Sequence, residues 1–219
     1  MELFSFLEPL RAEGFPVAFV SRVSGVMGSY QKEECLSELE PTHRGVVEEL
    51  GFQWSQLWRA EQVHGAGLAA VGAECSRQEY LEGVDGLMTG EQNSLLGIYV
   101  ADCGLIWVAD RGTGAVALLH SGRKGTEAGI FPRSVSMMSE KYGSKVEDLL
   151  VVLGPCIRPP HYEVDIASLI AHQAREAGVG DYYDCGICTG SEVDKYYSYR
   201  IEKGLTGRML GLLAPRAVR

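Results

Sequence analysis

Two kinds of segment recur along the chain: short apolar runs and longer amphipathic stretches. Short runs rich in Val, Ile and Leu, bounded by glycine, proline or polar turn residues, predict strands. These predicted strands span residues 16–23, 57–63, 67–71, 95–101, 105–109, 115–120 and 149–153. Helical periodicity and capping residues predict helices at residues 42–51, 127–142, 165–177 and 206–213. The regular strand–helix alternation of a doubly wound parallel sheet is missing, which favours an α+β fold with mixed sheets.

Composition agrees with a folded protein. The chain has 219 residues, of which 46% are hydrophobic and 22% charged, so it can bury a substantial core. No low-complexity stretch and no linker rich in Pro, Gly or Ser divides the sequence. We therefore expect a single domain over residues 1–219.

The charge balance excludes some partners. Twenty basic residues face 29 acidic ones, a net charge of −9, and an acidic surface repels the phosphate backbone of nucleic acids. No apolar run is long enough to cross a bilayer. The first fifteen residues lack the basic and apolar regions of an export signal. We expect a cytoplasmic protein without nucleic-acid or membrane partners.

Cysteine usage fits a reducing compartment. Six cysteines are scattered through the chain, and without an export signal they are expected to be free thiols. Cys185 and Cys188 form one CxxC pair, but no second pair completes a four-cysteine zinc site.

One predicted hairpin brings a cysteine and a histidine together. The turn at residues 110–114 joins two strands, and a turn centred between Gly112 and Thr113 pairs positions whose numbers add up to 225. Cys103 then faces position 122, with His120 as its diagonal neighbour on the same face of the sheet. A half-step error in the turn centre would put the two side chains on opposite faces. The pairing predicts either a shared metal ion or a Cys–His pair.

His64 is the third candidate, because it follows a predicted strand and precedes Gly65. Two imidazoles and a thiolate are a good donor set for Zn²⁺, and three protein ligands leave a fourth position for water or substrate, as in catalytic zinc sites. Taken singly, each histidine is also explained as a structural residue and Cys103 as a core thiol.

Nine short motifs occur in an order that resembles the YfiH/laccase-domain family, also labelled polyphenol oxidase or purine nucleoside phosphorylase. They are Gln-Val-His-Gly at 62–65, Asp-Gly-Leu-Met-Thr at 85–89, Ala-Asp-Cys at 101–103, His-Ser-Gly at 120–122, Gly-Pro-Cys-Ile at 154–157, Tyr-Glu-Val at 162–164, Cys-Thr at 188–189, Tyr-Ser-Tyr-Arg at 197–200 and Thr-Gly-Arg-Met at 206–209. The resemblance runs from about Phe19 to Leu213.

The resemblance implies a four-layer α/β/β/α fold. It also implies zinc bound by His64, Cys103 and His120, the three residues already singled out. The implied activity is phosphorolysis of adenosine, inosine and methylthioadenosine, with accompanying adenosine deamination. The older family name implies copper-dependent phenol oxidation, and we favour zinc over copper.

This sequence departs from the family pattern near the expected pocket. Where the family usually has His-Ala-Gly-Trp-Arg-Gly, the chain has His-Ser-Gly-Arg-Lys-Gly, which places Arg123 at the Trp position and Lys124 at the Arg position. Lys attracts a phosphate but cannot grip it as a bidentate fork. A segment that the family usually has before residue 165 is expected to be deleted.

Further candidate site residues follow from these patterns. Arg22, Arg123 and Lys124 are candidates for binding phosphate, with surface solvation as the alternative. Asp102 adjoins Cys103 and is a candidate for proton transfer, although a regular strand would direct it to the opposite face. Cys156 either lines the site or packs in the core.

Two other functions remain open at this point. Cys103 can act as a thiolate nucleophile with His120 as its base, giving amide hydrolysis or deamidation. Alternatively, the altered pocket marks a non-catalytic, zinc-containing protein that binds a ligand. The sequence leaves the oligomeric state open.

Overall fold

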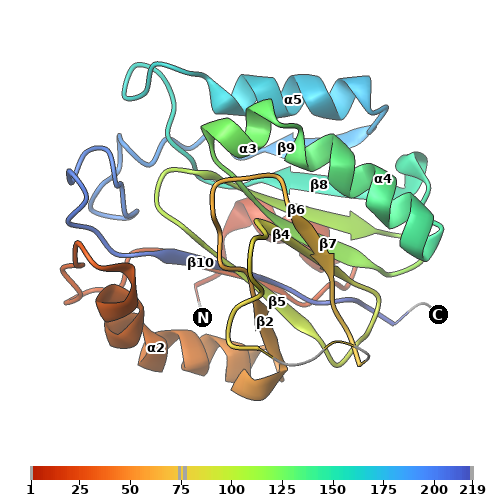
Figure 1. The fold of residues 1–219 in the computed structure, drawn as a ribbon, viewed down its shortest axis with the longest axis horizontal. Helices are drawn as coiled ribbons and strands as arrows, with labels where there is room; N and C mark the ends of the chain where they lie inside the picture. Colours follow the sequence, from red (N-terminus) through yellow and green to blue (C-terminus); the bar gives the residue numbers. More distant parts are fainter. Residues whose placement is uncertain (1, 74, 76–77, 218–219) are drawn as a thin grey trace.

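The fold consists of two mixed β-sheets stacked face to face, with helices on both outer faces. The computed structural model describes residues 2–73, 75 and 78–217. One sheet has the strand order β1-β10-β5-β2 and the other β3-β4-β7-β6-β8-β9. Helices α3, α4 and α5 cover the larger sheet and α2 covers the smaller one (Figure 1). The α+β class and the four-layer α/β/β/α arrangement are confirmed.

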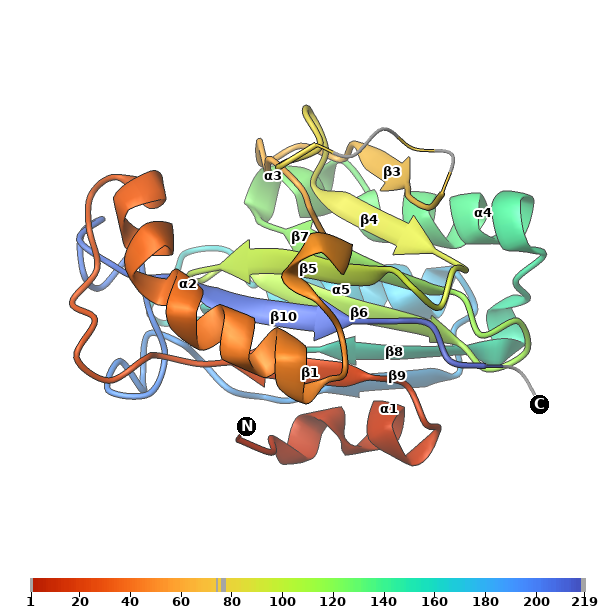
Figure 2. The same ribbon diagram turned by 90° about the horizontal axis from the view of Figure 1, so that it is seen from below.

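The strands have the bounds β1 Val17–Val20, β2 Leu57–Arg59, β3 Leu68–Ala70, β4 Gly86–Thr89, β5 Leu95–Val100, β6 Gly104–Asp110, β7 Val116–Ser121, β8 Leu149–Leu153, β9 Asp181–Asp184 and β10 Met209–Leu213. The α-helices are α1 Glu8–Ala12, α2 Lys32–Glu49, α3 Arg123–Glu127, α4 Ile130–Tyr142 and α5 Ile166–Glu176. Short 3₁₀ turns span Ser5–Leu7, Trp54–Gln56 and Val146–Asp148. Figure 2 shows α1 beside β1 and β9.

Strand β6 shows why the apolar runs are continuous. Leu105 and Trp107 point between the sheets, whereas Ile106 packs on the other face under the helices. Because both faces of the strand are covered, its sequence is continuously apolar and lacks the alternating polar residues of a strand with one face in water. The Trp107 indole nitrogen donates a hydrogen bond to the Leu212 carbonyl at 3.1 Å, which ties β6 to the facing sheet. A Cβ at Gly211 would lie 2.4 Å from Leu105 Cδ2, so this glycine permits the close approach of the sheets.

The predicted helix at residues 206–213 is wrong, because this segment contains β10. Met209–Leu213 lies between β1 and β5 and is fully buried. A short apolar run has no periodicity that separates a buried strand from a buried helix. Gly207 and Gly211, both poor helix formers, were the available signal.

Helix boundaries differ from the prediction for local reasons. Helix α2 begins at Lys32, ten residues before the predicted start at residue 42, and continues through Pro41. The helix expected at residues 127–142 is α4, which begins three residues later, at Ile130, because Gly129 has a left-handed backbone with a φ of 75°. The short helix α3 precedes it and was not predicted. Pro132 lies in the first turn of α4, where proline is tolerated. Strands β4 and β9 were not predicted.

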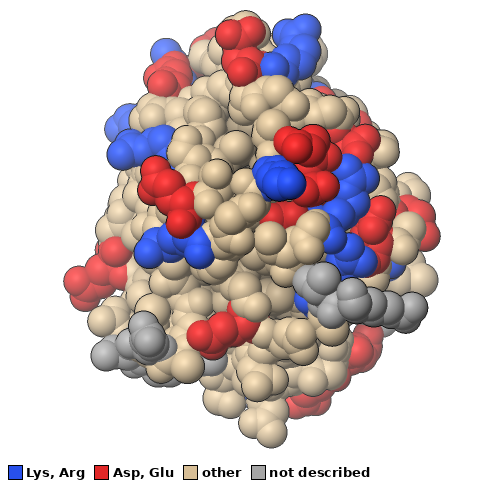
Figure 3. Space-filling view, turned by 90° about the vertical axis from the view of Figure 1, so that its right-hand side faces the viewer, with Lys and Arg blue, Asp and Glu red and all other residues tan. Residues whose placement is uncertain are grey.

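The surface does not carry one dominant charge on the side shown in Figure 3, where Lys and Arg lie among Asp and Glu. That face is the right-hand side of Figure 1. No helix in the described part of the chain is both long and apolar enough to cross a membrane.

A buried histidine in α2 predicts sensitivity to acid. The His43 side chain is fully buried against the Tyr99 ring, 5.7 Å between centroids, and neither ring nitrogen has a hydrogen-bond partner among the described residues. Burial lowers the His43 pKa from 6.5 to about 4, because the charged imidazolium would lose its solvation. Between about pH 6.5 and 4, His43 binds a proton in the unfolded chain but not in the folded one. The free energy of unfolding therefore falls as the pH drops through this range.

We expect His43→Leu to reduce this loss of stability, by at most about 3 kcal/mol between pH 7 and pH 4. Urea unfolding at several pH values measures it. His172→Leu, at an exposed position on α5, is the control and should keep the full pH dependence. An unchanged slope in His43→Leu would contradict the prediction.

Candidate metal centre

Three segments converge at the end of the sheets where β5 and β7 finish and β6 begins, near the left-hand loops of Figure 1. Strands β6 and β7 pair Gly104 with Ser121 and Leu105 with His120, so paired numbers add up to 225 as predicted. Cys103 faces position 122: a Cβ on Gly122 would lie 2.8 Å from Cys103 Sγ. The hairpin register is therefore confirmed.

The three candidate ligands form one compact group. His64, Cys103 and His120 each offer one ligand atom, and these atoms lie within 4.8 Å of one another. The two imidazole rings are nearly perpendicular, with centroids 4.8 Å apart. His120 is buried, Cys103 half-buried and His64 exposed, so the group is closed on the protein side and open to solvent on the other.

Asp85 holds both histidines in place and was missed by the sequence analysis. Its fully buried carboxylate accepts hydrogen bonds from His120 Nδ1 at 2.8 Å, from the His64 amide at 2.8 Å and from the Gly65 amide at 2.7 Å. Because Nδ1 of His120 is used in this way, Nε2 is left as the ligand atom. The motif at residues 85–89 contained Asp85, but only the fold shows that the carboxylate faces both histidines.

The His64 loop has an uncommon backbone conformation that its neighbours stabilise. Gln62 and His64 have φ values of 64° and 61°, a region that side chains other than glycine rarely occupy. Asp85 satisfies the amides of this turn, and the Gln62 side-chain oxygen accepts from the Tyr99 amide at 2.9 Å. A strained turn held by several hydrogen bonds is typical of functional sites.

The electrostatics favour a thiolate. Burial alone raises the pKa of the Cys103 thiol, but the imidazoles of His120 and His64 outweigh burial and lower that pKa from 9.0 to about 6. Burial alone lowers the pKa of His120, but Cys103 and Asp85 outweigh it and raise that pKa to about 9. Cys103 is therefore largely ionised at neutral pH before any metal binds.

This donor set fits a divalent cation. A thiolate and two imidazoles are borderline-soft ligands, one imidazole is oriented by a carboxylate, and the exposed side leaves room for a further ligand. A metal that binds His120 must displace its proton, so binding releases protons to solvent. The residues present can hold a transition-metal ion.

Asp102 lies beside Cys103 but outside the ligand group. It is buried with a φ of 83°. Its carboxylate accepts from the Thr189 hydroxyl at 2.6 Å and from the Arg200 amide at 2.7 Å. The carboxylate thus fastens two loops to the chain segment that carries Cys103.

The remaining candidates have different surroundings. Arg22 pairs with Glu202 at 2.7 Å, lies over the Tyr197 ring and borders a surface hollow of 640 Å³. Cys156 is fully buried and bridged to the backbone of Cys188, and burial raises the pKa of its thiol.

Arg123 and Lys124 are both exposed at the start of α3, directly after Gly122. Arg123 therefore directly follows Gly122, the residue whose added Cβ would contact Cys103 Sγ.

Comparison with known proteins now identifies the family. Residues 18–167 and 163–216 match the sequence pattern of a family described as multi-copper polyphenol oxidoreductase laccase. This chain belongs to the laccase-domain family. The two matched pieces of the laccase-domain pattern meet at residues 163–167, beside the expected deletion.

Individual relatives carry a second name. A laccase-domain relative from Deinococcus radiodurans called purine nucleoside phosphorylase is 31% identical, covering 90% of this chain and 88% of the relative. Purine nucleoside phosphorylase YlmD of Geobacillus stearothermophilus is 29% identical, covering 79% of this chain and 77% of the relative. The crystal structure of that YlmD has a TM-score of 0.78 at 25% identity, covering 92% of this chain and 91% of the other. The Bacillus licheniformis hypothetical protein YfiH has the same fold, with a TM-score of 0.76.

The family description and this site differ in the number of metals. Within the described residues, His64, Cys103 and His120 are the one group of at least three metal-binding side chains. A laccase-domain chain of this kind offers one metal position there.

Proposed function

We propose that this protein is a zinc-dependent purine nucleoside phosphorylase that acts on adenosine, inosine and methylthioadenosine and also deaminates adenosine in the cytoplasm. The observation that carries the proposal is the open His64–Cys103–His120 group, in a chain 31% identical to a named purine nucleoside phosphorylase along most of its length.

The proposed chemistry divides between the metal and the chain. When bound, zinc supplies a Lewis acid that polarises an oxygen atom or lowers the pKa of water toward 7. Cys103 and the two histidines hold the ion, and Asp85 keeps the proton on Nδ1 of His120. We expect the nucleoside to approach the ion from the solvent-exposed His64 side of the group.

Phosphorolysis needs a second reactant. The C1′–N9 bond of the nucleoside breaks with its electron pair going to the purine, and a phosphate oxygen forms the new bond to C1′. The phosphate proton ends on the purine, so the products are a free purine and ribose 1-phosphate. Deamination adds water at the purine ring and releases ammonia.

Zinc is favoured over copper for a chemical reason. Reduction of O₂ to water takes four electrons, which laccase chemistry spreads over several copper centres. The described residues form a single three-ligand group. A single group suits Lewis-acid chemistry, which transfers no electrons.

The proposal predicts zinc content and products together. Protein purified without chelator should contain about one zinc per chain by elemental analysis. Incubation with adenosine and phosphate should give adenine, hypoxanthine and ribose 1-phosphate, and prior chelation should abolish all three. Zinc-loaded protein that turns over no purine nucleoside would reject the proposal and favour a non-catalytic ligand-binding protein.

One observation favours a second candidate function. Cys103, His120 and Asp85 also have the order of nucleophile, base and orienting carboxylate found in hydrolases. One thiolate cannot be a zinc ligand and a nucleophile at the same moment. Iodoacetamide labelling of Cys103 in protein purified without chelator, with no zinc bound, would support the hydrolase. Stoichiometric zinc with Cys103 unlabelled would reject it.

A further inference from the structure

Arg123, the first residue of α3, and Arg200, in the loop between β9 and β10, share the carboxylate of Glu163. Arg200 Nη2 lies 2.6 Å from one oxygen of Glu163, and Arg123 Nη1 lies 3.9 Å from the other. All three side chains are about half exposed. The Arg200 guanidinium also lies over the Tyr162 ring, 4.8 Å from its centroid.

Both arginines are anchored next to Cys103. The Arg200 amide donates to Asp102, the residue before Cys103, at 2.7 Å. Arg123 follows Gly122, where an added Cβ would lie 2.8 Å from Cys103 Sγ. The backbones of Arg123 and Arg200, from distant parts of the chain, are therefore both held near Cys103.

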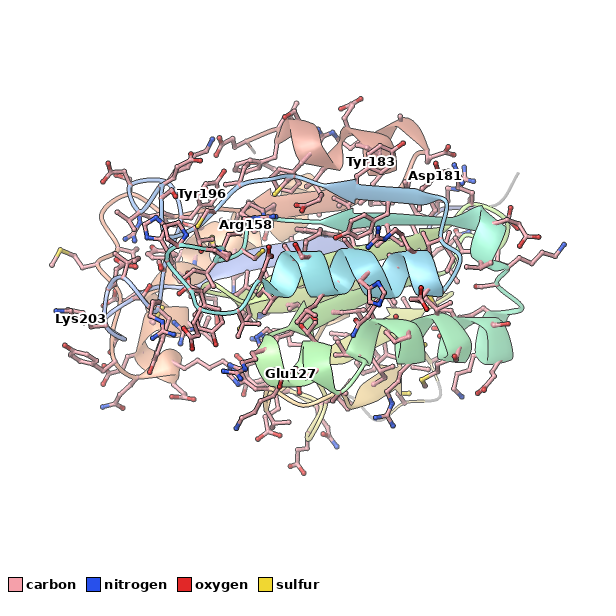
Figure 4. All side chains as sticks on the ribbon, turned by 90° about the horizontal axis from the view of Figure 1, so that it is seen from above. Glu127, Arg158, Asp181, Tyr183, Tyr196 and Lys203 are labelled. Atoms are coloured by element: carbon pink, nitrogen blue, oxygen red, sulfur yellow. The ribbon has the colours of Figure 1, made fainter. Side chains whose placement is uncertain are left out.

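The Glu163 carboxylate contacts the two arginines in an arrangement that a bound anion could take over. Each of its oxygens faces a different guanidinium, which is the arrangement that a phosphate group adopts between two arginines. Exposed ion pairs contribute little stability, so Glu163 can leave at little cost. Arg123 stays held by Glu127 on α3, with Nε to carboxylate at 2.9 Å (Figure 4 labels Glu127).

Local positive charge is required here because the chain as a whole carries a charge of −9. A phosphate dianion is repelled by most of such a surface. Planar guanidinium groups bind it bidentately and keep their charge at any working pH.

We propose that Arg123 and Arg200 bind inorganic phosphate, and that Glu163 occupies this position until phosphate displaces it. The assignment of this anion as the second reactant rests on the proposed phosphorolysis. Because the backbones of both arginines lie near Cys103, we expect phosphate held here to be able to attack C1′ of a nucleoside bound at the metal centre.

The test compares variants whose effects have opposite signs. Arg123→Met and Arg200→Met should each raise the KM for phosphate about tenfold or more, since each removes a charge-assisted contact. Glu163→Gln should lower that KM severalfold, because the competing charge is removed. Arg133→Met, at an exposed position on α4, is the control and should leave the KM unchanged. Zinc content is measured for every variant.

A purely structural ion pair gives a different outcome. Glu163→Gln and Arg200→Met would then both weaken activity, and the KM for phosphate would move in the same direction or not at all. Either result, with zinc retained and nucleosides still turned over, would overturn the site while leaving the proposed function intact.

Calorimetric titration with inorganic phosphate alone separates the two proposals. One result is that the two arginine variants weaken phosphate binding and Glu163→Gln tightens it, in protein that turns over no nucleoside. That result would support the phosphate site and reject the phosphorylase. Titration with adenosine 5′-monophosphate is the second arm. If Glu163→Gln tightens the nucleotide but not phosphate, the arginines recognise a phosphorylated substrate and the inference is wrong.

Discussion

Cys103→Ala is expected to abolish metal binding and nucleoside turnover together. The thiolate is the one anionic ligand among the three residues, and its pKa of about 6 makes it available at neutral pH. Protein zinc sites bind with roughly 10–16 kcal/mol shared among about four ligands, so losing one should weaken binding at least about a hundredfold. Elemental analysis and a competition titration with a zinc chelator measure the loss.

Cys188→Ala provides a matched control. Cys188 is also a half-buried thiol, but its sulfur contacts the Arg158 carbonyl and lies outside the ligand group. It should retain metal and activity. A Cys103→Ala protein that keeps stoichiometric zinc and full turnover would show that the ligand assignment is wrong.

Asp85→Asn should weaken metal binding about 10–100-fold without removing any ligand. Asparagine has nearly the same shape, but its amide nitrogen cannot accept a hydrogen bond. One of the three donors from His64, Gly65 and His120 is then left unsatisfied. Both the orientation of His120 and the strained turn at His64 depend on this carboxylate, so the metal off-rate should rise.

Asp110→Asn is the control that separates the positioning of the metal ligands by Asp85 from a general loss of stability. Asp110 is as fully buried as Asp85. It lies at the turn end of the β6–β7 hairpin, away from the metal centre, and accepts hydrogen bonds from Gly112 and Thr113. Both variants should lose about 1–3 kcal/mol of unfolding free energy. Only Asp85→Asn should also lose zinc affinity, measured by competition with a chelator below the unfolding temperature. Equal zinc affinities in the two variants would contradict the positioning role.

Residues close together in the sequence were sufficient to predict strand pairing where a short turn sets that pairing. The turn at residues 110–114 placed Cys103 and His120 on one face, and the register of β6 and β7 agrees. Turn geometry and a period of two leave few alternatives over so short a distance. The continuous apolar runs of β5, β6 and β8 were likewise read correctly, because strands covered on both faces need no polar positions.

Local signals failed where packing overrides propensity. Residues 206–213 looked like a closing helix, yet β10 fills the centre of the smaller sheet, with partners about 100 residues and nearly 200 residues away in the chain. Pro41 lies inside α2, although proline normally opens a helix or ends it. These outcomes depend on neighbours that the sequence order does not reveal.

The sequence by itself determined the mixed α+β class, the family and one edge of the metal centre, because periodicity, turn chemistry and short motifs act over a few residues. The family resemblance also proposed His64 as the third ligand, but only tertiary structure shows that its side chain meets Cys103 and His120 and that Asp85 supports both histidines. Tertiary structure also brought Arg123 and Arg200 to opposite oxygens of Glu163. These contacts join segments tens of residues apart, and only the stacking of the two sheets places their loops at one end of the molecule.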